Sequence, residues 1–321
     1  MSFQRADKLT AGSRFRDWPF IVICAVVLAL LSQPWQVLEP RDTLVLIVSV
    51  SAVFSLLWWS DKYEREPFIT ISWAFMWGAF PACLFSYILE AAVTTLSGGV
   101  LIEEGMKLIA LLIIFRRGSI DSWTDGLVMG GYIGLGFAAI EDLLYAISGN
   151  DSFKVLVTRG IFSIFAHTFF SGLGAVVIVI GLLRKRWWLS GIGFLFACFL
   201  HLTWNTVLAW EIFSYNVIGF FFFFSFVPPA VLIATSIFLR KHERHRLLIE
   251  GKFAVDNGQM TEEQLWLVVD FRARRFARKQ LDSHSLKTAF DQEIYKNVRL
   301  LLNGSLREQK TELSGSAEEI V

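Results

Sequence analysis

The sequence predicts an all-α, polytopic membrane helix bundle of about eight transmembrane helices with a small helical cytoplasmic tail. Three observations predict this class. Apolar residues make up 54% of the 321 residues and charged residues only 18%, whereas soluble proteins average roughly 25% charged residues. The mean hydropathy is +0.51. Uncharged stretches of about 20 residues, the length that crosses a bilayer as a helix, recur along the chain.

The positions of the charged residues define the predicted spans. No charge interrupts 18–38, which is longer than a signal-peptide core and has no A-x-A cleavage pattern, so we expect this span to be retained. Segment 67–115 holds only four charges and is long enough to cross twice, with a turn at Ser97–Gly99. The predicted spans are 18–38, 43–60, two within 67–115, 126–148, 155–183, 187–210 and 216–239.

The charges of the loops predict the orientation. Lys and Arg precede the first span and recur in alternate loops, for example at Arg116–Arg117 and Arg184–Arg186, whereas the opposite loops hold only Arg41 and Lys154. Positively charged loops stay in the cytoplasm, and eight spans place both termini on one side. The sequence therefore predicts a multi-pass protein of the cell membrane with both termini cytoplasmic.

The chain divides into a cytoplasmic N-terminal tail (1–17), a transmembrane domain (18–239) and a cytoplasmic C-terminal helical tail (240–321) with a disordered end. In the last part, Thr261–Gln264 predicts a capping box that opens a helix with an apolar face reaching Phe276, and a second helix is predicted over 286–302. The first of these helices is basic, which is typical of a helix lying on anionic lipid, although a plain helical appendage is the alternative. Fifteen basic residues after Leu239 are offset by thirteen acidic ones, so no nucleic-acid partner is expected.

Ionisable side chains inside membrane spans are costly and therefore suggest function. Four groups in four spans each place two side chains on one helix face at i, i+4 spacing. The candidate catalytic residues in them are Glu103, Glu104, Lys107, Glu141, His167, His201 and Asn205. At about 1.5 Å of rise per residue, they lie roughly 8 to 18 Å from the non-cytoplasmic ends of their spans. Because two of the spans run outward and two inward, this agreement in depth predicts one cluster in the outer half of the bilayer.

Small residues predict how this cluster is packed. Gly126, Gly130 and Gly134 form a stripe that lets a neighbouring helix approach closely. Glu141 lies seven residues after Gly134 and therefore on the same face. We expect its carboxylate to face the fourth or the sixth span rather than lipid.

Each group alone has a plain structural interpretation. Lys107 can neutralise a glutamate of its own helix, and His201 can form a hydrogen bond to pack its helix. Ser171 and Phe137 are expected to be packing residues, with Phe137 keeping water away from Glu141. Arg159 is expected to extend to the nearby membrane surface.

The residue types predict hydrolysis by activated water. Adjacent carboxyl groups differ in proton affinity, so Lys107 can keep one of Glu103 and Glu104 ionised while the other takes a proton from water. The histidines and Asn205 can donate hydrogen bonds to a developing oxyanion. This chemistry requires no cofactor. A divalent metal held by Glu and His ligands is the alternative. The HExxH, GxGD and GxSxG signatures of other membrane proteases do not occur in the sequence.

The ordered motifs resemble those of the PrsW family of intramembrane proteases, which is similar to the CAAX prenyl endopeptidases and bacteriocin-processing membrane enzymes. The motifs are Glu103-Glu104-x-x-Lys107, Phe137-x-x-x-Glu141, His167-x-x-x-Ser171 and His201-x-x-x-Asn205. The resemblance covers about 61–205 and includes the acid-Pro element Glu64–Pro67.

The resemblance implies a glutamate-dependent peptidase that cuts a membrane protein within or beside the bilayer. It implies that Glu103 and Glu104 activate water and that Lys107 holds one of them ionised. Glu141 would be the acid of the second motif. His167, His201 and Asn205 would stabilise the oxyanion or orient the water. The family's best-known role, a site-1 cleavage in regulated proteolysis signalling, is not carried over, because the tail after residue 240 lies outside the match.

Two other function classes stay open from the sequence. Chains of Glu, His and Lys also relay protons in proton-coupled transporters, although no two halves of this sequence match each other. A non-catalytic protein that binds or shelters membrane partners is the third possibility. The sequence makes no prediction of the oligomeric state.

Overall fold

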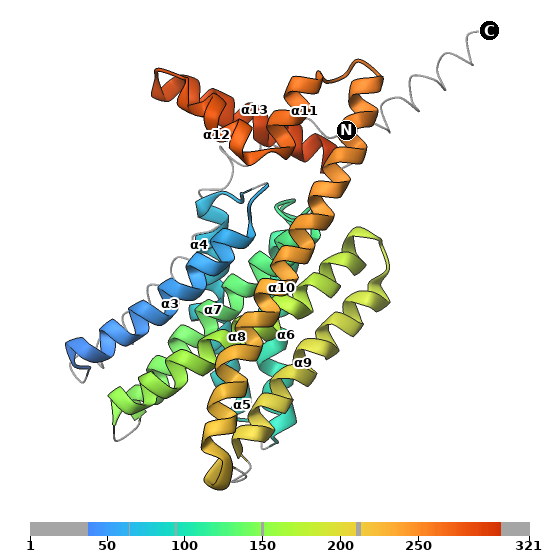
Figure 1. Cartoon of the computed structure of the whole chain (residues 1–321). Helices are drawn as coiled ribbons and strands as arrows, with labels where there is room; N and C mark the ends of the chain where they lie inside the picture. Colours follow the sequence, from blue (N-terminus) through green and yellow to red (C-terminus); the bar gives the residue numbers. More distant parts are fainter. Residues whose placement is uncertain (1–37, 64, 94, 149–150, 210–212, 303–321) are drawn as a thin grey trace, which may run out of the picture.

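The computed structural model describes residues 38–302 apart from 64, 94, 149–150 and 210–212, and all regular elements in this part are helices. They form a bundle with a small helical layer at one end (Figure 1), which confirms the predicted class. The elements of the bundle are α3 (Pro40–Ser60), α4 (Phe68–Trp77), the π-helical segment η2 (Gly78–Ala82), α5 (Cys83–Glu90), α6 (Leu96–Arg116), α7 (Trp123–Ser148), α8 (Ser152–Leu183), α9 (Trp187–Ala209) and α10 (Phe213–Asp256). The layer consists of α11 (Glu262–Val269), α12 (Phe271–Lys279) and α13 (His284–Leu302).

Five stretches of the described residues are long and apolar enough to cross a membrane. They are Pro40–Ser60, Phe68–Glu90, Trp123–Ser148, Ser152–Leu183 and Trp187–Thr206, and each coincides with a predicted span. The predicted fourth span is α6, which carries Glu103, Glu104, Lys107 and Arg116. The predicted eighth span lies within α10. The predicted first span and the N-terminal tail fall outside the described residues.

The predicted turn at Ser97–Gly99 is wrong, because these residues form the first turn of α6. The side chain of Thr95 caps this helix by accepting a hydrogen bond from the Gly98 backbone N–H at 3.2 Å. A capped first turn tolerates glycine, since its backbone N–H groups have no helical partner in any case. The chain reverses direction before Thr95 instead.

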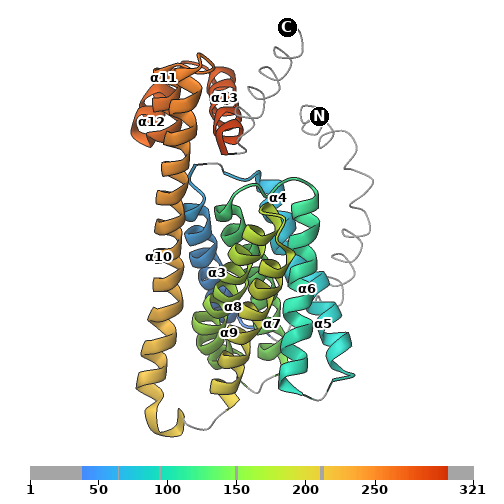
Figure 2. The ribbon, with the colours of Figure 1, turned by 90° about the vertical axis from the view of Figure 1, so that its right-hand side faces the viewer.

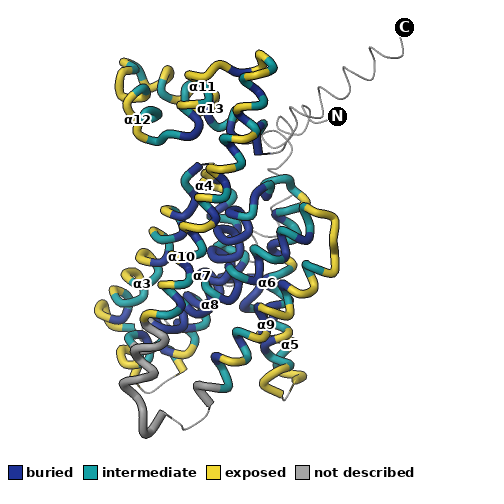
Figure 3. The backbone as a smooth tube through the Cα atoms, turned by 45° about the vertical axis from the view of Figure 1, so that its right-hand side comes forward, coloured by how far each residue is buried: buried dark blue, intermediate teal, exposed yellow. Residues whose placement is uncertain are grey.

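Helix α7 lies at the centre of the bundle (Figure 3). In its apolar stretch of 18 residues, 83% are buried, compared with 17% in the corresponding stretch of α3. The predicted glycine stripe produces this burial. A Cβ atom on Gly126 would lie 3.0 Å from the Ala175 carbonyl oxygen, and Cβ atoms on Gly130 and Gly134 would collide with carbonyl groups of α8. Backbone contact with α8 is therefore possible only because these side chains are absent.

We expect Gly134→Ala to lower the free energy of unfolding by about 1–3 kcal/mol and with it the unfolding temperature. The new methyl group would collide with the carbonyl of His167 and the side chain of Ser171. Gly105→Ala is the matched control, since a Cβ atom there meets no atom within 4 Å. Thermal unfolding of the two purified variants in detergent measures the difference. Equal unfolding temperatures would show that α7 and α8 can separate without cost.

Helix α10 links the bundle to the helical layer (Figure 2). It continues through the predicted domain boundary at 239 and ends at Asp256. Ser236 Oγ lies 2.7 Å from Ser60 Oγ of α3, and the ring of His242 stacks on Trp123 of α7 at 4.2 Å. The membrane part and the tail are thus joined by one continuous helix that packs along the bundle.

The predicted capping box of the tail is confirmed: Thr261 and Gln264 exchange side-chain to backbone hydrogen bonds at the start of α11. The helix predicted to continue to Phe276 is interrupted at Asp270, which adopts an extended conformation and caps α12 by accepting hydrogen bonds from two backbone N–H groups. A side chain that caps a new helix competes with continuation of the old one. The predicted helix over 286–302 corresponds to α13, and the predicted disordered end lies outside the described residues.

A buried acid holds α10 near the bundle end where α7 begins. Glu243 is 5% exposed and accepts a hydrogen bond from Thr124 Oγ1 at 3.4 Å. Burial raises the pKa of Glu243 to about 8, and the charges of Asp61 and Asp121 act in the same direction, while Arg246 opposes them. The protonated form therefore fits the folded protein best.

This pKa predicts that stability falls as the pH rises from about 4.5 to 8. The unfolded chain releases the Glu243 proton near its ordinary pKa, but the folded chain keeps it up to about pH 8, so folding is favoured by low pH in this window. We expect Glu243→Gln to remove part of this dependence and to raise the unfolding temperature at pH 8.5 relative to the wild type. Unfolding temperatures of both proteins at pH 5.5, 7 and 8.5 measure it. Parallel curves for the two proteins would contradict the prediction.

Candidate active site

Four helices bring six of the seven predicted site residues together inside the bundle. Glu103, Glu104 and Lys107 come from α6, and Glu141 from α7. His167 comes from α8 and His201 from α9. Contacts of 2.8–3.7 Å link them, as the common depth predicted.

Glu104 is one of two carboxylates in the cluster that bind two partners through a single oxygen atom. Its Oε1 atom accepts hydrogen bonds from Lys107 Nζ at 2.8 Å and from His201 Nδ1 at 2.9 Å. The side chains of Glu104 and Lys107 are 2% and 3% exposed, so this ion pair is buried. Glu104 therefore fixes both the ammonium group and the orientation of the His201 ring.

His167 is held from both sides in the same way. Its Nε2 atom lies 3.0 Å from Glu141 Oε2, and its Nδ1 atom lies 3.1 Å from Lys107 Nζ. Lysine can only donate, so Nδ1 accepts and Nε2 carries the proton that it donates to Glu141. The Glu104 carboxylate can only accept, so the His201 Nδ1 atom that faces it carries a proton.

Arg159 belongs to this network, although we expected it to extend to the membrane surface. Its guanidinium group donates to Glu141 Oε2 at 2.9 Å and to Asp142 Oδ1 at 2.8 Å. Asp142 is fully buried, and a guanidinium that bridges two carboxylates is more favourable there than in water-exposed lipid headgroups. A sequence signal existed: Arg159, Ser163, His167 and Ser171 follow each other at i, i+4 on one face of α8.

Glu103 differs from Glu104 because it forms no hydrogen bond with Lys107 or with His201 Nδ1 in the described part of the chain. Its Oε2 atom is buried and forms no hydrogen bond with a described residue, and it lies 3.7 Å from His201 Nε2. Glu90 of α5 is a neighbouring carboxyl group that interacts electrostatically with Glu103. Glu103 therefore places a carboxyl oxygen beside the Nε2 atom of His201, with capacity for a further ligand.

Aromatic rings enclose the cluster. Lys107 Nζ lies 4.0 Å from the ring centre of Phe137, and the Phe137 and His167 rings are 5.4 Å apart. The Phe170 ring stacks on His201 at 5.3 Å. Phe137 therefore covers the ammonium group and the His167 ring. The predicted shielding of Glu141 by Phe137 stays a prediction. Enclosure by rings strengthens the charge interactions inside the cluster.

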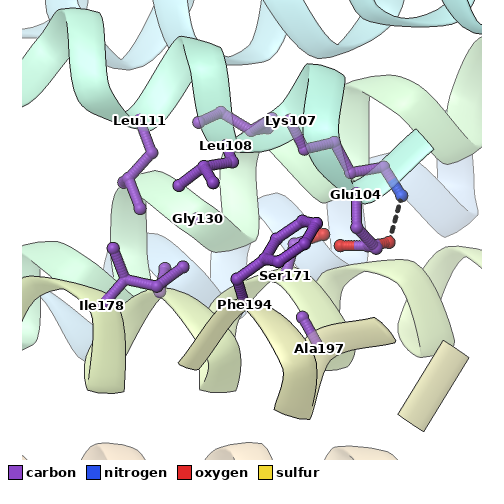
Figure 4. A pocket seen from close by; sticks show the side chains of 11 residues that line it. Glu104, Lys107, Leu108, Leu111, Gly130, Ser171, Ile178, Phe194 and Ala197 are labelled. Carbon is purple, nitrogen blue, oxygen red and sulfur yellow. Dashed lines mark hydrogen bonds and ion pairs between the residues drawn. The ribbon is translucent and has the colours of Figure 1, made fainter. Parts of the chain in front are cut away.

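A small cavity begins at the buried ion pair (Figure 4). Glu104, Lys107 and Ser171 form its polar end, and Leu108, Ile178 and Phe194 are among the apolar residues of its wall. It has room for about one water molecule. Ser171 Oγ is buried and forms no hydrogen bond with a described residue, so a water molecule there would have at least three polar partners.

The cluster has the composition of a divalent metal site. One ligand atom each of Glu103, His167 and His201 lie within 4.8 Å of one another. One Glu and two His are a common ligand set for catalytic zinc. Glu141 and Glu104 hold the other ring nitrogens of the two histidines, the arrangement found around metal-bound histidines. The Glu103 Oε2 atom, which has no hydrogen-bond partner among the described residues, adds to this fit, whereas the ammonium group of Lys107 beside His167 Nδ1 would have to move.

Asn205 is the predicted site residue that the structure does not connect to the others. It lies one turn beyond His201 on α9, on the same side of the helix, and is partly exposed. No hydrogen bond joins its side chain to another residue of the described part. Its predicted contact with an oxyanion stays a prediction.

Comparison with known proteins gives a consistent result. A family model described as PrsW family intramembrane metalloprotease matches residues 66–233, a segment that contains all seven predicted site residues. No solved structure matches this chain.

Three curated proteins called Protease PrsW are similar to this chain. The protein of Bacillus subtilis (strain 168) is 33% identical over 108 residues, which are 30% of this chain and 49% of the relative. That of Geobacillus kaustophilus (strain HTA426) is 26% identical over 131 residues, 37% of this chain and 57% of the relative. That of Clostridioides difficile (strain 630) is 27% identical over 146 residues, which are 40% of this chain and 61% of the relative. The chain spans about half the length of these curated relatives.

Proposed function

This chain belongs to the PrsW family of intramembrane proteases, and from that premise we propose that it hydrolyses a peptide bond of a membrane protein within or beside the bilayer. One observation carries the proposal. A carboxyl oxygen of Glu103 that has no hydrogen-bond partner among the described residues lies 3.7 Å from the Nε2 atom of His201 inside a membrane helix bundle. A buried carboxylate beside an imidazole is equipped to handle a water molecule.

The geometry assigns different tasks to the two adjacent glutamates. We propose that Glu103 accepts the proton of the attacking water and passes it to the leaving amine. Glu104 is then a positioning residue, because both contacts of its Oε1 atom orient other members of the site. The water oxygen forms the new bond to the carbonyl carbon, the C–N bond breaks, and the amine leaves with the transferred proton.

The developing oxyanion needs donors that are already in place. Lys107 has three N–H bonds and uses two of them, on Glu104 and His167, so the third is available to an oxyanion. Glu141 and Arg159 act indirectly, because Glu141 binds the His167 ring and Arg159 holds Glu141 in place. Asn205 is proposed as a further donor to the substrate or water.

Glu103, His167 and His201 would hold a divalent metal if this chain uses one, as the description of its family suggests. A bound metal would supply a Lewis acid and lower the pKa of a coordinated water. The tasks of the surrounding residues stay the same: Glu104 and Glu141 orient the two imidazole rings, and Phe137 excludes bulk water. Metal analysis of the purified wild type and of His201→Gln separates this arrangement from one without a metal. A bound metal in the wild type that the variant lacks would support the three-ligand site.

Comparative proteomics of membrane proteins tests the proposed activity and can name a substrate. Cells that make the wild type should contain shortened membrane fragments that are missing from cells with Glu103→Gln, where the intact precursor accumulates. Cells with Glu293→Gln are the matched control, because this variant removes an exposed carboxyl group of α13 outside the cluster. Identical fragment patterns in all three strains would reject the protease assignment for this chain.

A further inference from the structure

A group of cationic side chains lies outside the Glu/His cluster, at the end of the bundle where α3 ends. Lys62 and Arg65 follow α3, Arg240 belongs to α10, and Arg275 belongs to α12. We call these four residues the basic cluster. Three of them lie over aromatic rings: Arg65 over Trp58 at 4.9 Å, Arg240 over Trp59 at 4.2 Å and Lys62 over Phe271 at 4.1 Å.

The charges of the basic cluster repel one another. Burial lowers the pKa of Lys62, and the positive charges of Arg240, Arg275 and Arg65 lower it further. Within the described part of the chain, no ion pair involves any of the four residues, and Arg240 Nη1 is buried without a hydrogen-bond partner. Asp61 interacts electrostatically with Arg65, but burial raises its pKa to about 7 and its carboxyl group accepts the Glu66 backbone N–H. The cluster therefore has an excess of positive charge that an external anion would neutralise.

Helix α12 extends this charge along one exposed face. Arg272, Arg275, Phe276 and Lys279 follow the i, i+3, i+4, i+7 pattern, and all four are exposed, Phe276 by 67%. The opposite face is occupied: Phe271 packs on Tyr63 at 4.5 Å, and Arg274 donates to the carbonyl groups that end α11. An exposed face with three cations and one aromatic ring is typical of helices that lie at a lipid surface.

The position of the basic cluster along the membrane normal points to the same partner. Trp58 and Trp59 form the last turn of α3, and tryptophans at the end of a span sit at the level of the lipid headgroups. Lys62 and Arg65 follow the end of α3 by two and five residues, at the level where lipid phosphates lie. The layer of α11, α12 and α13 stands at the same end of the bundle (Figure 1).

We propose that the basic cluster and the exposed face of α12 bind the headgroup of an anionic phospholipid, in the leaflet that the distribution of loop charges assigns to the cytoplasm. The lipid phosphate would lie among Lys62, Arg240 and Arg275, and Phe276 would enter the headgroup layer. Basic pockets at the cytoplasmic ends of membrane helices bind anionic headgroups by this chemistry. The site is independent of peptide hydrolysis.

The test uses the full-length protein in an uncharged detergent, titrated with dioctanoylphosphatidylglycerol, dioctanoylphosphatidylcholine or inorganic phosphate. We expect the anionic lipid alone to raise the unfolding temperature, and native mass spectrometry to retain it on the protein. Lys62→Gln combined with Arg275→Gln should weaken the affinity for this lipid about thirtyfold, since each basic residue near an anionic surface contributes a factor of about five to the affinity.

Arg186→Gln combined with Lys252→Gln is the matched control, because it removes two exposed charges from the same predicted side of the membrane. An unchanged lipid affinity in this control supports the proposal. An equal loss of affinity in both double variants would show a general charge effect and overturn it. Equal responses to the two lipids, or a response to inorganic phosphate as large as that to the anionic lipid, would overturn it as well. Unfolding temperatures without lipid verify that both variants are folded.

Discussion

Glu103→Gln should reduce the rate of peptide cleavage about a thousandfold while leaving the fold intact. The amide keeps the shape of the side chain but cannot accept a proton, and a positioned general base contributes roughly 10² to 10⁴ to the rate. The loss should appear in kcat, because the carboxylate acts on the reacting water rather than on substrate binding. A purified preparation with a cleavable membrane peptide measures it under single-turnover conditions.

Two other carboxyl groups provide the controls for this experiment. Glu293→Gln should change the rate less than tenfold, because Glu293 is exposed in α13 and lies outside the Glu/His trio. Glu104→Gln should lower the rate through a misplaced His201 ring and should also lower stability, since the ammonium group of Lys107 loses its carboxylate partner. If Glu103→Gln keeps a tenth or more of the wild-type rate, the assignment of Glu103 as the base is wrong.

Lys107→Met should destabilise the protein by about 3–5 kcal/mol. The ammonium group is 3% exposed and is bound to Glu104 Oε1 and His167 Nδ1. Methionine fills a similar space but leaves Glu104 as a buried charge without its cationic partner, and removing one member of a buried ion pair costs about this much. Equilibrium unfolding in mixed detergent micelles measures the loss of free energy.

The double variant Lys107→Met with Glu104→Gln shows whether the unpaired charge is the cause. It should recover part of the lost stability, because the neutral amide at 104 no longer needs a cation. Lys252→Met is the exposed control and should change the free energy of unfolding by less than about 0.5 kcal/mol. A double variant that is less stable than Lys107→Met would show that packing, not charge, dominates at this position.

Local sequence features predicted six residues of the cluster, but they did not predict Arg159, and the structure does not connect the predicted Asn205 to the others. Depth in a span depends only on the count of residues from a helix end, so Glu104 and His201 were expected to meet although 97 residues separate them. Helical periodicity predicted that Glu141 lies on the face of the glycine stripe, and the stripe does contact α8. Hydropathy alone predicted the helical class and five spans that the structure contains.

The contacts within the site were not predictable in the same way. Arg159 lies close to the end of a span, which suggests contact with headgroups, but the two carboxylates of α7 face it only because α7 and α8 pack backbone to backbone. The difference between Glu103 and Glu104 likewise depends on which of two adjacent side chains points at Lys107 and the His201 Nδ1 atom.

By itself the sequence determined that this chain forms a helical membrane bundle and which ionisable side chains share one depth in it, because hydropathy and helical spacing are properties of each segment alone. The tertiary structure decided which glutamate binds Lys107 and His201 Nδ1, where Arg159 binds, that Thr95 starts α6 and that Asp270 ends α11 by capping α12. These outcomes depend on side chains competing for the same partners, and in the site those partners lie on different helices.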